Sequence, residues 1–358
     1  MKALITVIIP VYNAARYLRR SLDSLLGQTY RELEIICVND GSTDESVSIL
    51  TEYAGCDSRV KVIHQENSGV SAARNAGLDA ATGEYVTFVD ADDWVESDAY
   101  EKLMKHAPDG VDLICFGTQV EGDISDAEKE ESMSYLNRLS DGVIAPSVVN
   151  IESMNGCVWN KLFRREMIEK YHCRFPVGVP YGEDTAFVYC AAAIMQQAYG
   201  CTQHLYHYLI HPASATGCDF ARSCKALLHL KVVQYVKQFV DVHRIRCEKK
   251  NELVASVFVY AYSYVLSRMT GELREEAQRA ALVVGRETGA LRNRYQWRIR
   301  ELLSQTQCPL LRFVRRFEAN RVCYGIGRFA LLSITYETER KIYRLLGRVI
   351  CVRQRVGW

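Results

Sequence analysis

Short hydrophobic runs alternate with helical stripes over the first third of the chain. Five runs are rich in β-branched residues, which is typical of strands, and they cover residues 4–9, 33–38, 60–64, 84–89 and 112–117. Several are apolar at almost every position, as strands are when both faces of their sheet are covered. The pattern predicts an α/β fold with a mainly parallel sheet and helices on both faces.

Three helices are predicted between these strands. The first places four leucines on one face at helical spacing between residues 18 and 26. Residues 42–45 read Ser-Thr-Asp-Glu and fit a capping box for the second helix, in which Ser42 caps and Glu45 reaches back. The third carries small or apolar residues at helical spacing from Val70 to Ala80. This alternation predicts right-handed crossovers between parallel strands.

The later part of the chain is less regular. Residues 119–150 are acidic and rich in Ser and Asp, so we expect an excursion over the surface with room for one short helix. A strand is predicted over 203–210, and beyond residue 220 the spacing of apolar residues is mainly helical. We therefore expect two domains: 1–220 is the α/β domain and 221–358 is a mainly helical C-terminal region.

Charge is distributed unevenly along the 358 residues. The formal charge is +1, but residues 311–358 hold eleven Arg or Lys against three Glu, so this basic tail is +8 and the remainder is −7. The chain outside the basic tail is acidic, which does not favour binding of nucleic acid over its surface, so no nucleic-acid partner is expected. The tail interleaves Arg with apolar residues. It either docks on an anionic membrane face or packs on the acidic body as a helical domain.

Cysteine usage and the N-terminus indicate a cytoplasmic protein. The 13 cysteines include no Cys-x-x-Cys pair, which favours reduced thiols over a disulfide framework or a zinc site. The first residues lead straight into a strand-like run without a secretory signal pattern. The longest uncharged apolar-rich stretch, 253–266, is shorter than the roughly 20 residues of a membrane-spanning helix. Attachment to the inner face of the membrane stays open.

Polar and acidic residues follow three of the predicted strands, at 10–13, 39–42 and 90–94. Ligands bind at this carboxyl edge in open parallel sheets. The first strand-to-helix turn has no glycine, and the chain has no Gly-x-x-x-x-Gly-Lys-Ser/Thr loop, which argues against dinucleotide-binding and phosphate-loop proteins. A nucleotide site here would handle its phosphates through a cation held by residues 90–93.

Asp90 and Asp92 are the candidates for this cation site. Alternate residues of an extended segment point the same way, so both carboxylates are expected to face one site as the next helix begins. Mg²⁺ or Mn²⁺ is typically held by one or two protein carboxylates together with phosphate oxygens and water. The alternatives are that these aspartates cap the following helix and that Asp40 shapes an Asp-Gly turn.

Four motifs then make the sequence recognisable. They read Thr-Val-Ile-Ile-Pro-Val-Tyr-Asn at 6–13, Val-Asn-Asp-Gly-Ser-Thr-Asp at 38–44, Asn-Ser-Gly-Val-Ser-Ala-Ala-Arg-Asn-Ala-Gly at 67–77 and Val-Asp-Ala-Asp-Asp at 89–93. Together with looser matches at 159–163 and 181–185, the chain resembles glycosyltransferase family 2, which has the GT-A fold. The resemblance implies an inverting enzyme that uses a nucleotide-sugar donor, usually with uridine, and Mn²⁺ or Mg²⁺.

The resemblance also implies roles for single residues. The Pro10–Tyr12 backbone and Asp40 would hold the base with Arg74 beside it, Asp90 would touch the ribose, and Asp92 would bind the metal. For Arg74 the alternative is an ion pair with a nearby carboxylate. His211 is the candidate for a second metal ligand, and His207 is a weaker one; each alternatively is an ordinary surface or core residue.

Glu183 and Asp184 match the family's acidic pair near the acceptor. An inverting transfer needs one carboxylate to take the proton of the attacking hydroxyl, and we assign Asp184 to this role. Glu183 either raises the pKa of Asp184 by like-charge repulsion or orients a loop, and both residues also suit a helix N-terminus. Lys161 either meets an acceptor or phosphate group or has a plain surface role.

The sequence therefore predicts an enzyme that moves a sugar from a nucleotide diphosphate, with UDP favoured, to a glycan or lipid-linked acceptor in surface polysaccharide synthesis. A sugar-phosphate nucleotidylyltransferase would need a glycine-rich, basic loop after the first strand, and 10–13 lacks one. The other alternative is a catalytically silent nucleotide-sugar-binding or scaffold protein of the same fold.

Overall fold

The structure is a computed structural model in which the chain forms two compact units, Met1–Arg300 and Glu301–Trp358. Each unit is described by itself. The residues described are 2–106, 110–144, 155–179, 181–211, 229–245, 247–268, 277, 280–281, 283–285, 287–288, 313–318, 321–326, 329–336, 340–345 and 348–354.

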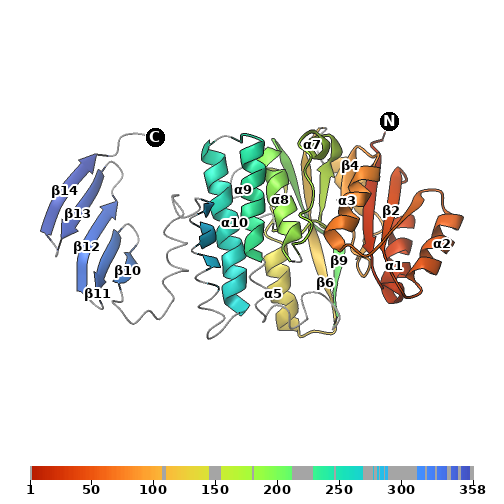
Figure 1. Ribbon diagram of the computed structural model, residues 1–358, viewed down its shortest axis with the longest axis horizontal. Helices are drawn as coiled ribbons and strands as arrows, with labels where there is room; N and C mark the ends of the chain where they lie inside the picture. The colour runs from red at the N-terminus through yellow and green to blue at the C-terminus, as the bar shows by residue number, and fades with distance from the viewer. Residues whose placement is uncertain are drawn as a thin grey trace. The chain divides into compact units, whose positions relative to one another are not determined.

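A mixed sheet runs through the first unit (Figure 1). Its strands are β1 (Ile5–Val11), β2 (Leu33–Asp40), β3 (Val60–Gln65), β4 (Tyr85–Phe88), β5 (Trp94–Val95), β6 (Leu113–Gly122), β7 (Gly142–Ile144), β8 (Lys161–Arg164) and β9 (Ala198–Ile210). The spatial order is β3-β2-β1-β4-β8-β6-β9-β5, and β7 pairs with β9. The five strands predicted in the first third of the chain are all present, and so is the strand predicted near 203–210.

Helices connect and cover these strands. They are α1 (Ala15–Leu26), α2 (Ser46–Cys56), α3 (Val70–Ala80), α4 (Ala99–His106), α5 (Asp126–Leu136), α7 (Arg165–Lys170), α8 (Glu183–Ile194), α9 (Lys231–Val242) and α10 (Cys247–Arg268). Helices α8, α9 and α10 pack against one another (Figure 1). The helices α9 and α10 lie where the sequence predicts helical structure after residue 220.

The first four long strands pair as the alternating pattern predicts. Strand β1 is parallel to β2 and to β4, and β2 is parallel to β3. The chain adds β2 and β3 on one side of β1 and β4 on the other, so the strand order reverses between β1 and β4. The crevice beyond the carboxyl ends of strands at such a point is where open α/β sheets bind ligands. Antiparallel β8 then extends the sheet beyond β4.

The two faces of β1 are covered by different helices. Val7, Ile9 and Val11 belong to one core with Leu18 and Leu22 of α1. Residues of a strand alternate between faces, so Ile8 points the other way. There it meets α3 so closely that a Cβ added to Gly77 would lie 2.4 Å from Ile8 Cγ2. This two-sided burial explains why β1 is apolar at nearly every position.

Helix α8 is buried along its length and is held by an aromatic cluster. Phe187 stacks on Phe175 with ring centroids 4.2 Å apart, and it forms T-shaped pairs with Phe88 and Phe163 at centroid distances of 5.8 and 5.2 Å. Offset and edge-to-face aromatic pairs of this kind stabilise a core beyond their buried area. The cluster fixes where α8 begins, and the helix begins at Glu183.

The capping box predicted at residues 42–45 is wrong. Helix α2 begins at Ser46, its N-cap residue Glu45 makes no side-chain cap, and Asp44 Oδ1 accepts from Ser46 N over 3.0 Å. Side chains here also accept hydrogen bonds from the start of α1: Ser42 Oγ from Asn13 N, Ser46 Oγ from Ala14 N, and Asp44 Oδ2 from Ala15 N. Helix α1 has an alanine at its N-cap, so its free N–H groups are satisfied from the next loop.

The acidic segment after residue 119 is more ordered than its composition predicts. Strand β6 continues to Gly122, and α5 begins with a capping box in which Ser125 and Glu128 exchange hydrogen bonds. The expected short helix is therefore present, with a start signal that the prediction placed elsewhere.

The second unit contains strands rather than helices in its described part. The strands β10 (Phe313–Glu318), β11 (Arg321–Ile326), β12 (Phe329–Tyr336), β13 (Arg340–Leu345) and β14 (Arg348–Gln354) form an antiparallel sheet in chain order. The helical prediction is wrong for these residues. These residues are rich in β-branched and aromatic side chains, which favours strands.

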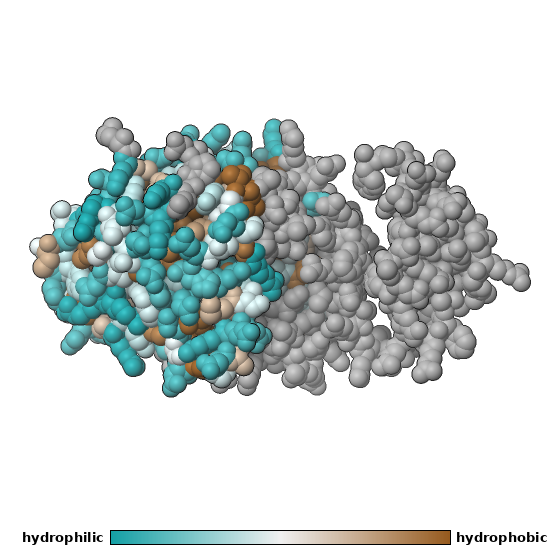
Figure 2. Space-filling model, turned by 180° about the vertical axis from the view of Figure 1, so that it is seen from behind, coloured by the Kyte–Doolittle hydropathy of each residue, from teal (hydrophilic) through white to brown (hydrophobic). Residues whose placement is uncertain are grey.

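No helix within the described ranges is both long and apolar enough to cross a membrane. The face of the first unit in Figure 2 is mainly hydrophilic where it is coloured, with apolar residues scattered among polar ones. Scattered apolar residues of this kind are normal on a protein surface.

Candidate active site at the carboxyl edge of the sheet

The acidic motif after β4 is a turn. Asp93 N donates to Asp90 O over 3.0 Å, and strand β5 follows directly at Trp94. The expectation of an extended segment leading into a helix is therefore wrong, because aspartate favours turns. Helix capping by these aspartates is excluded, since the next helix starts at Ala99. The side chains of Asp90 and Asp92 keep 28% and 31% of their surface exposed, so a ligand can reach both.

Asp92 and His211 lie together, as the resemblance implies for two ligands of one cation. Asp92 Oδ2 is 2.9 Å from His211 Nε2. The imidazole stacks on Tyr17 of α1 with ring centroids 4.7 Å apart, which fixes its orientation. In the described part of the chain no group of three or more His, Cys, Asp or Glu forms a metal site. One carboxylate and one imidazole suit a cation whose remaining ligands are phosphate oxygens and water.

His207 is placed away from this pair. Its ring nitrogens lie 2.9 Å from Glu96 Oε1 and 3.1 Å from Glu121 Oε1. The ring stacks on Trp94, and the guanidinium of Arg20 lies 3.6 Å from the Trp94 ring centroid. Arg20 also donates to the backbone oxygen of Asp92. His207 therefore supports the strand that follows the acidic turn, and His211 is the histidine beside Asp92.

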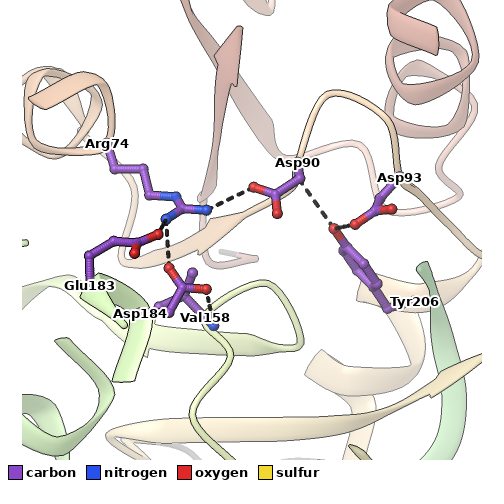
Figure 3. A network of polar contacts seen from close by, with 7 residues as sticks. All are labelled: Arg74, Asp90, Asp93, Val158, Glu183, Asp184 and Tyr206. Carbon is purple, nitrogen blue, oxygen red and sulfur yellow. Dashed lines mark hydrogen bonds and ion pairs between the residues drawn. The ribbon is translucent and has the colours of Figure 1, made fainter. Parts of the chain in front are cut away.

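Arg74 contacts three carboxylates from two parts of the chain (Figure 3). Its side chain is 3% exposed, and Nη2 lies 2.9 Å from Asp90 Oδ1. Nη1 lies 2.6 Å from Asp184 Oδ1 and 3.1 Å from Glu183 Oε1. The guanidinium also lies over the ring of Phe175 at 5.4 Å. The predicted alternative for Arg74, an ion pair with a carboxylate, describes this geometry.

Glu183 and Asp184 are neighbours with different proton affinities. Burial raises the pKa of Glu183, and the charge of Asp184 raises it further. The pKa of Asp184 is raised as well, by burial and by the charge of Asp90, although Arg74 and hydrogen bonds from Val158 N–H and the Glu183 carboxyl group oppose the rise. We infer that Glu183 carries the proton and that Asp184 is the ionised member of the pair.

Asp40, the last residue of β2, is buried against the loop that leads into α3. Its Oδ1 accepts from Ser68 N and Gln65 Nε2, and its Oδ2 accepts from Gly69 N, at 2.7 to 2.9 Å. A carboxylate offers about four acceptor positions, so one remains for a ligand. Tyr12 follows β1 with a side chain 53% exposed. The structure thus separates Asp40, which shapes the loop, from the group around Arg74.

Neither alternative predicted for Lys161 describes its place. The side chain is fully buried, and Nζ donates to Asn155 Oδ1, Cys157 O and Asn160 Oδ1 at 2.6 to 2.9 Å. Burial lowers the pKa of Lys161. The ammonium group therefore fastens the loop that carries Val158, whose N–H faces Asp184 Oδ2.

Sequence reasoning missed Tyr206 and the role of Asp93. Tyr206 Oη donates to Asp93 Oδ2 over 2.6 Å and accepts from Asp90 N (Figure 3). Leu209 N donates to Asp93 Oδ1, so the buried Asp93 joins the acidic turn to β9. A tyrosine in a strand carries no signal of such a contact. The available signal was Asp93, the third aspartate of the motif, because the predicted cation site needs only Asp90 and Asp92.

Comparisons with known sequences give the family of the chain. A profile of glycosyl transferase family 2 matches residues 6–172. The uncharacterized glycosyltransferase YibD of Escherichia coli K12 is 38% identical over 268 residues, which is 72% of this chain and 74% of YibD. The putative glycosyltransferase EpsH of Bacillus subtilis 168 is 37% identical over 222 residues. That match covers 59% of this chain and 62% of EpsH, so the chain spans less than two thirds of this relative.

Solved structures show the same fold at low sequence identity. Staphylococcus aureus TarS (residues 1–349) in complex with UDP-GlcNAc superposes with a TM-score of 0.56 at 17% identity, over 91% of this chain and 98% of TarS. The mannosyltransferase PcManGT of Pyrobaculum calidifontis, in complex with GDP-Man and Mn²⁺, gives 0.51 at 17% identity over 85% of both chains. The predicted GT-A fold is confirmed, and with the extended identity to YibD the chain belongs to glycosyltransferase family 2.

Proposed function

We propose that this protein transfers one sugar from a nucleoside diphosphate donor to a glycan or lipid-linked acceptor, with inversion at the anomeric carbon. The observation that carries the proposal is the meeting of two acidic groups at one edge of the sheet. Asp92 with His211 suits a cation, and Arg74 links Asp90 to Asp184. Family membership and the donor complexes of TarS and PcManGT support the same reading.

On the donor side, each predicted contact has a chemical reason. The Pro10–Tyr12 backbone and the remaining acceptor position of Asp40 suit the donor groups of a uracil ring, and Asp90 suits a ribose hydroxyl. Arg74 contributes to donor binding by holding Asp90 in an ion pair. Asp92 and His211 would hold Mn²⁺ or Mg²⁺, which neutralises charge on the departing diphosphate. The Mn²⁺ bound in PcManGT supports a divalent cation.

On the acceptor side, Asp184 takes the proton of the attacking hydroxyl. Its carboxylate is oriented by Arg74 and by the start of α8, and its neighbour Glu183 supplies a hydrogen bond that favours the ionised form. A positioned general base contributes about 10²- to 10⁴-fold to a rate. The acidic pair thus suits an acceptor with an uncharged hydroxyl, as glycans and lipid-linked saccharides have.

We further propose that the protein works in surface polysaccharide synthesis on the cytoplasmic side of the membrane, where the basic tail meets anionic lipid. In the tail sheet, strand register places Phe317, Val322, Ile334, Tyr343 and Cys351 in one row across all five strands. Arg316 and Arg344 belong to the neighbouring row. A sheet that combines apolar and basic residues suits an anionic membrane surface.

The experiment is a panel of UDP- and GDP-sugars with Mn²⁺, with oligosaccharide and lipid-linked acceptors, read as released nucleoside diphosphate. We expect release with one donor class. Asp92→Ala should lose metal-assisted donor binding, whereas Asp184→Asn should bind the donor and lose transfer by at least about 10²-fold. Turnover retained in both variants contradicts the assigned roles. Metal-dependent UDP binding with no release from any donor favours the catalytically silent alternative.

A further inference from the structure

Arg74 pairs with three carboxylates in the site, and it joins residues that the proposed function keeps apart. Its guanidinium contacts Asp90 on one side and Asp184 and Glu183 on the other, all within 3.1 Å (Figure 3). Asp90 follows β4 at the donor edge, and Asp184 lies 110 residues from Arg74, at the start of α8. One rigid, planar group therefore spans the donor and acceptor sides.

The geometry also distinguishes the two oxygens of Asp184. Oδ1 receives the short contact of 2.6 Å from Arg74 Nη1, whereas Oδ2 is 3.5 Å from Val158 N. A hydrogen bond of 3.5 Å is weak. Oδ2 therefore has the weaker of these two contacts, and the guanidinium fixes the plane of the carboxylate.

We propose that Arg74 is a positioning residue for the proton acceptor: it orients Asp184, keeps its charge, and ties that charge to the donor-side Asp90. This proposal rests on the function proposed above, which makes Asp184 the proton acceptor. Lysine would not replace Arg74, because a single ammonium group lacks the fork that reaches carboxylates on both sides.

The charged surroundings of Asp184 make the link to Asp90 measurable. The groups that face it are Arg74 on α3, Asp90 after β4, Glu183 on its own helix, and Cys157 and Lys161 on the loop that precedes and enters β8. Burial raises the pKa of Asp184 and Asp90 raises it further, while Arg74 opposes both. Three carboxyl groups share one guanidinium. Removing Arg74 should therefore raise the titration midpoint of Asp184, whereas removing Asp90 should lower it.

The test follows the Asp184 carboxyl carbon by NMR in the full chain labelled with ¹³C-carboxyl aspartate, with its signal assigned by its loss in Asp184→Asn. In Arg74→Gln the titration midpoint should rise by about 1 to 3 pH units, since an opposite charge at this distance lowers the pKa of a carboxyl group by that amount. Arg74→Lys should shift the midpoint less. The matched control is Arg174→Gln, because Arg174 is also part-buried and paired with two carboxylates, Asp79 and Glu169.

An unchanged midpoint in folded Arg74→Gln, or an equal shift in Arg174→Gln, overturns the proposal. Asp90→Asn gives a second measurement that does not depend on how well the Arg74 variants fold. It should lower the Asp184 midpoint, because one negative charge beside the guanidinium is gone, and no change in that variant also overturns the proposal. The titration needs no substrate, so its failure is distinct from a failure of the proposed transfer activity.

Discussion

The acidic pair at the start of α8 consists of two adjacent carboxyl groups whose chemistry is set by their surroundings. Both side chains are largely buried, with 14% of Glu183 and 20% of Asp184 exposed. The sequence interpretation considered Glu183 as the group that raises the pKa of Asp184 by repulsion. The structure reverses this relation, because the charge of Asp184 raises the pKa of Glu183, and Glu183 donates a hydrogen bond in return.

A stability measurement tests this assignment. The pKa of Glu183 is raised in the folded protein above its ordinary value of 4.5, so the unfolded chain loses a proton that the folded protein keeps. Above pH 4.5 the wild type should therefore lose stability relative to Glu183→Gln, by up to about 1.4 kcal/mol per pH unit until Glu183 ionises in the folded state. Urea unfolding of both proteins at pH 5, 6, 7 and 8 measures the difference. A difference that stays constant with pH contradicts the assignment.

The residues of the site could be named from the sequence, but their partners could not. Asp90, Asp92, Asp184 and His211 stand in or near recognisable motifs. The contacts of Arg74 join segments 16, 109 and 110 residues apart, and no spacing rule predicts which carboxylates share one guanidinium. Lys161 is a similar case, since three uncharged acceptors hold it in the interior.

At the scale of elements, the start of α8 depends on close packing against the loop before β8. Gly156 approaches Thr185, the residue after Asp184, so closely that an added Cβ would lie 2.4 Å from Thr185 Oγ1. The aromatic cluster around Phe187 holds the rest of the helix in place. The helix therefore has little freedom to move away from an intruding methyl group.

Gly156→Ala should destabilise the protein by about 1 to 3 kcal/mol, the usual cost of overpacking, and should slow transfer by displacing the start of α8. The matched control is Gly55→Ala in α2, where an added Cβ meets nothing within 4 Å and should stabilise the helix by about 0.5 to 1 kcal/mol. Denaturant unfolding gives the stabilities. Thr185→Ala should partly rescue Gly156→Ala, and the absence of coupling between the two changes would show that the contact is unimportant.

Sequence patterns predicted the first elements well because a two-sided parallel sheet leaves a strong signal. Strands β1 and β2 are apolar almost throughout, and the faces of β1 are buried by α1 and α3. The helix-start signals were less decisive, since Ser-x-x-Glu occurs at both Ser42 and Ser125 and only the second forms a capping box. Tertiary contacts redirected the first set of side chains to α1.

At the scale of the whole molecule, the contrast between an acidic body and a basic tail implies a charged partner surface. Each Lys or Arg near an anionic membrane adds about 1 kcal/mol of attraction, and salt screens it. The tail carries a net charge of +8. Its strand register groups apolar residues into a row that spans the sheet.

We expect the full chain to float with liposomes of phosphatidylglycerol and phosphatidylcholine at low salt and to stay at the bottom of the gradient at high salt. Arg316→Glu combined with Arg344→Glu should weaken flotation, and liposomes of phosphatidylcholine alone should recover little protein. Protein that remains at the bottom with anionic liposomes at low salt contradicts membrane docking. That result would favour a tail that packs on the acidic body.

The central claim is that Asp92 and His211 hold a cation that in turn holds a nucleoside diphosphate, and calorimetry of UDP binding tests it most directly. The wild type should bind UDP at least about tenfold more tightly with Mn²⁺ than without it, a difference of about 1.4 kcal/mol. Asp92→Ala and His211→Ala should lose this dependence. His204 is an exposed histidine of β9, and His204→Ala should keep the dependence on Mn²⁺. UDP binding that is equally tight without metal, or a metal dependence retained in both site variants, would contradict the account.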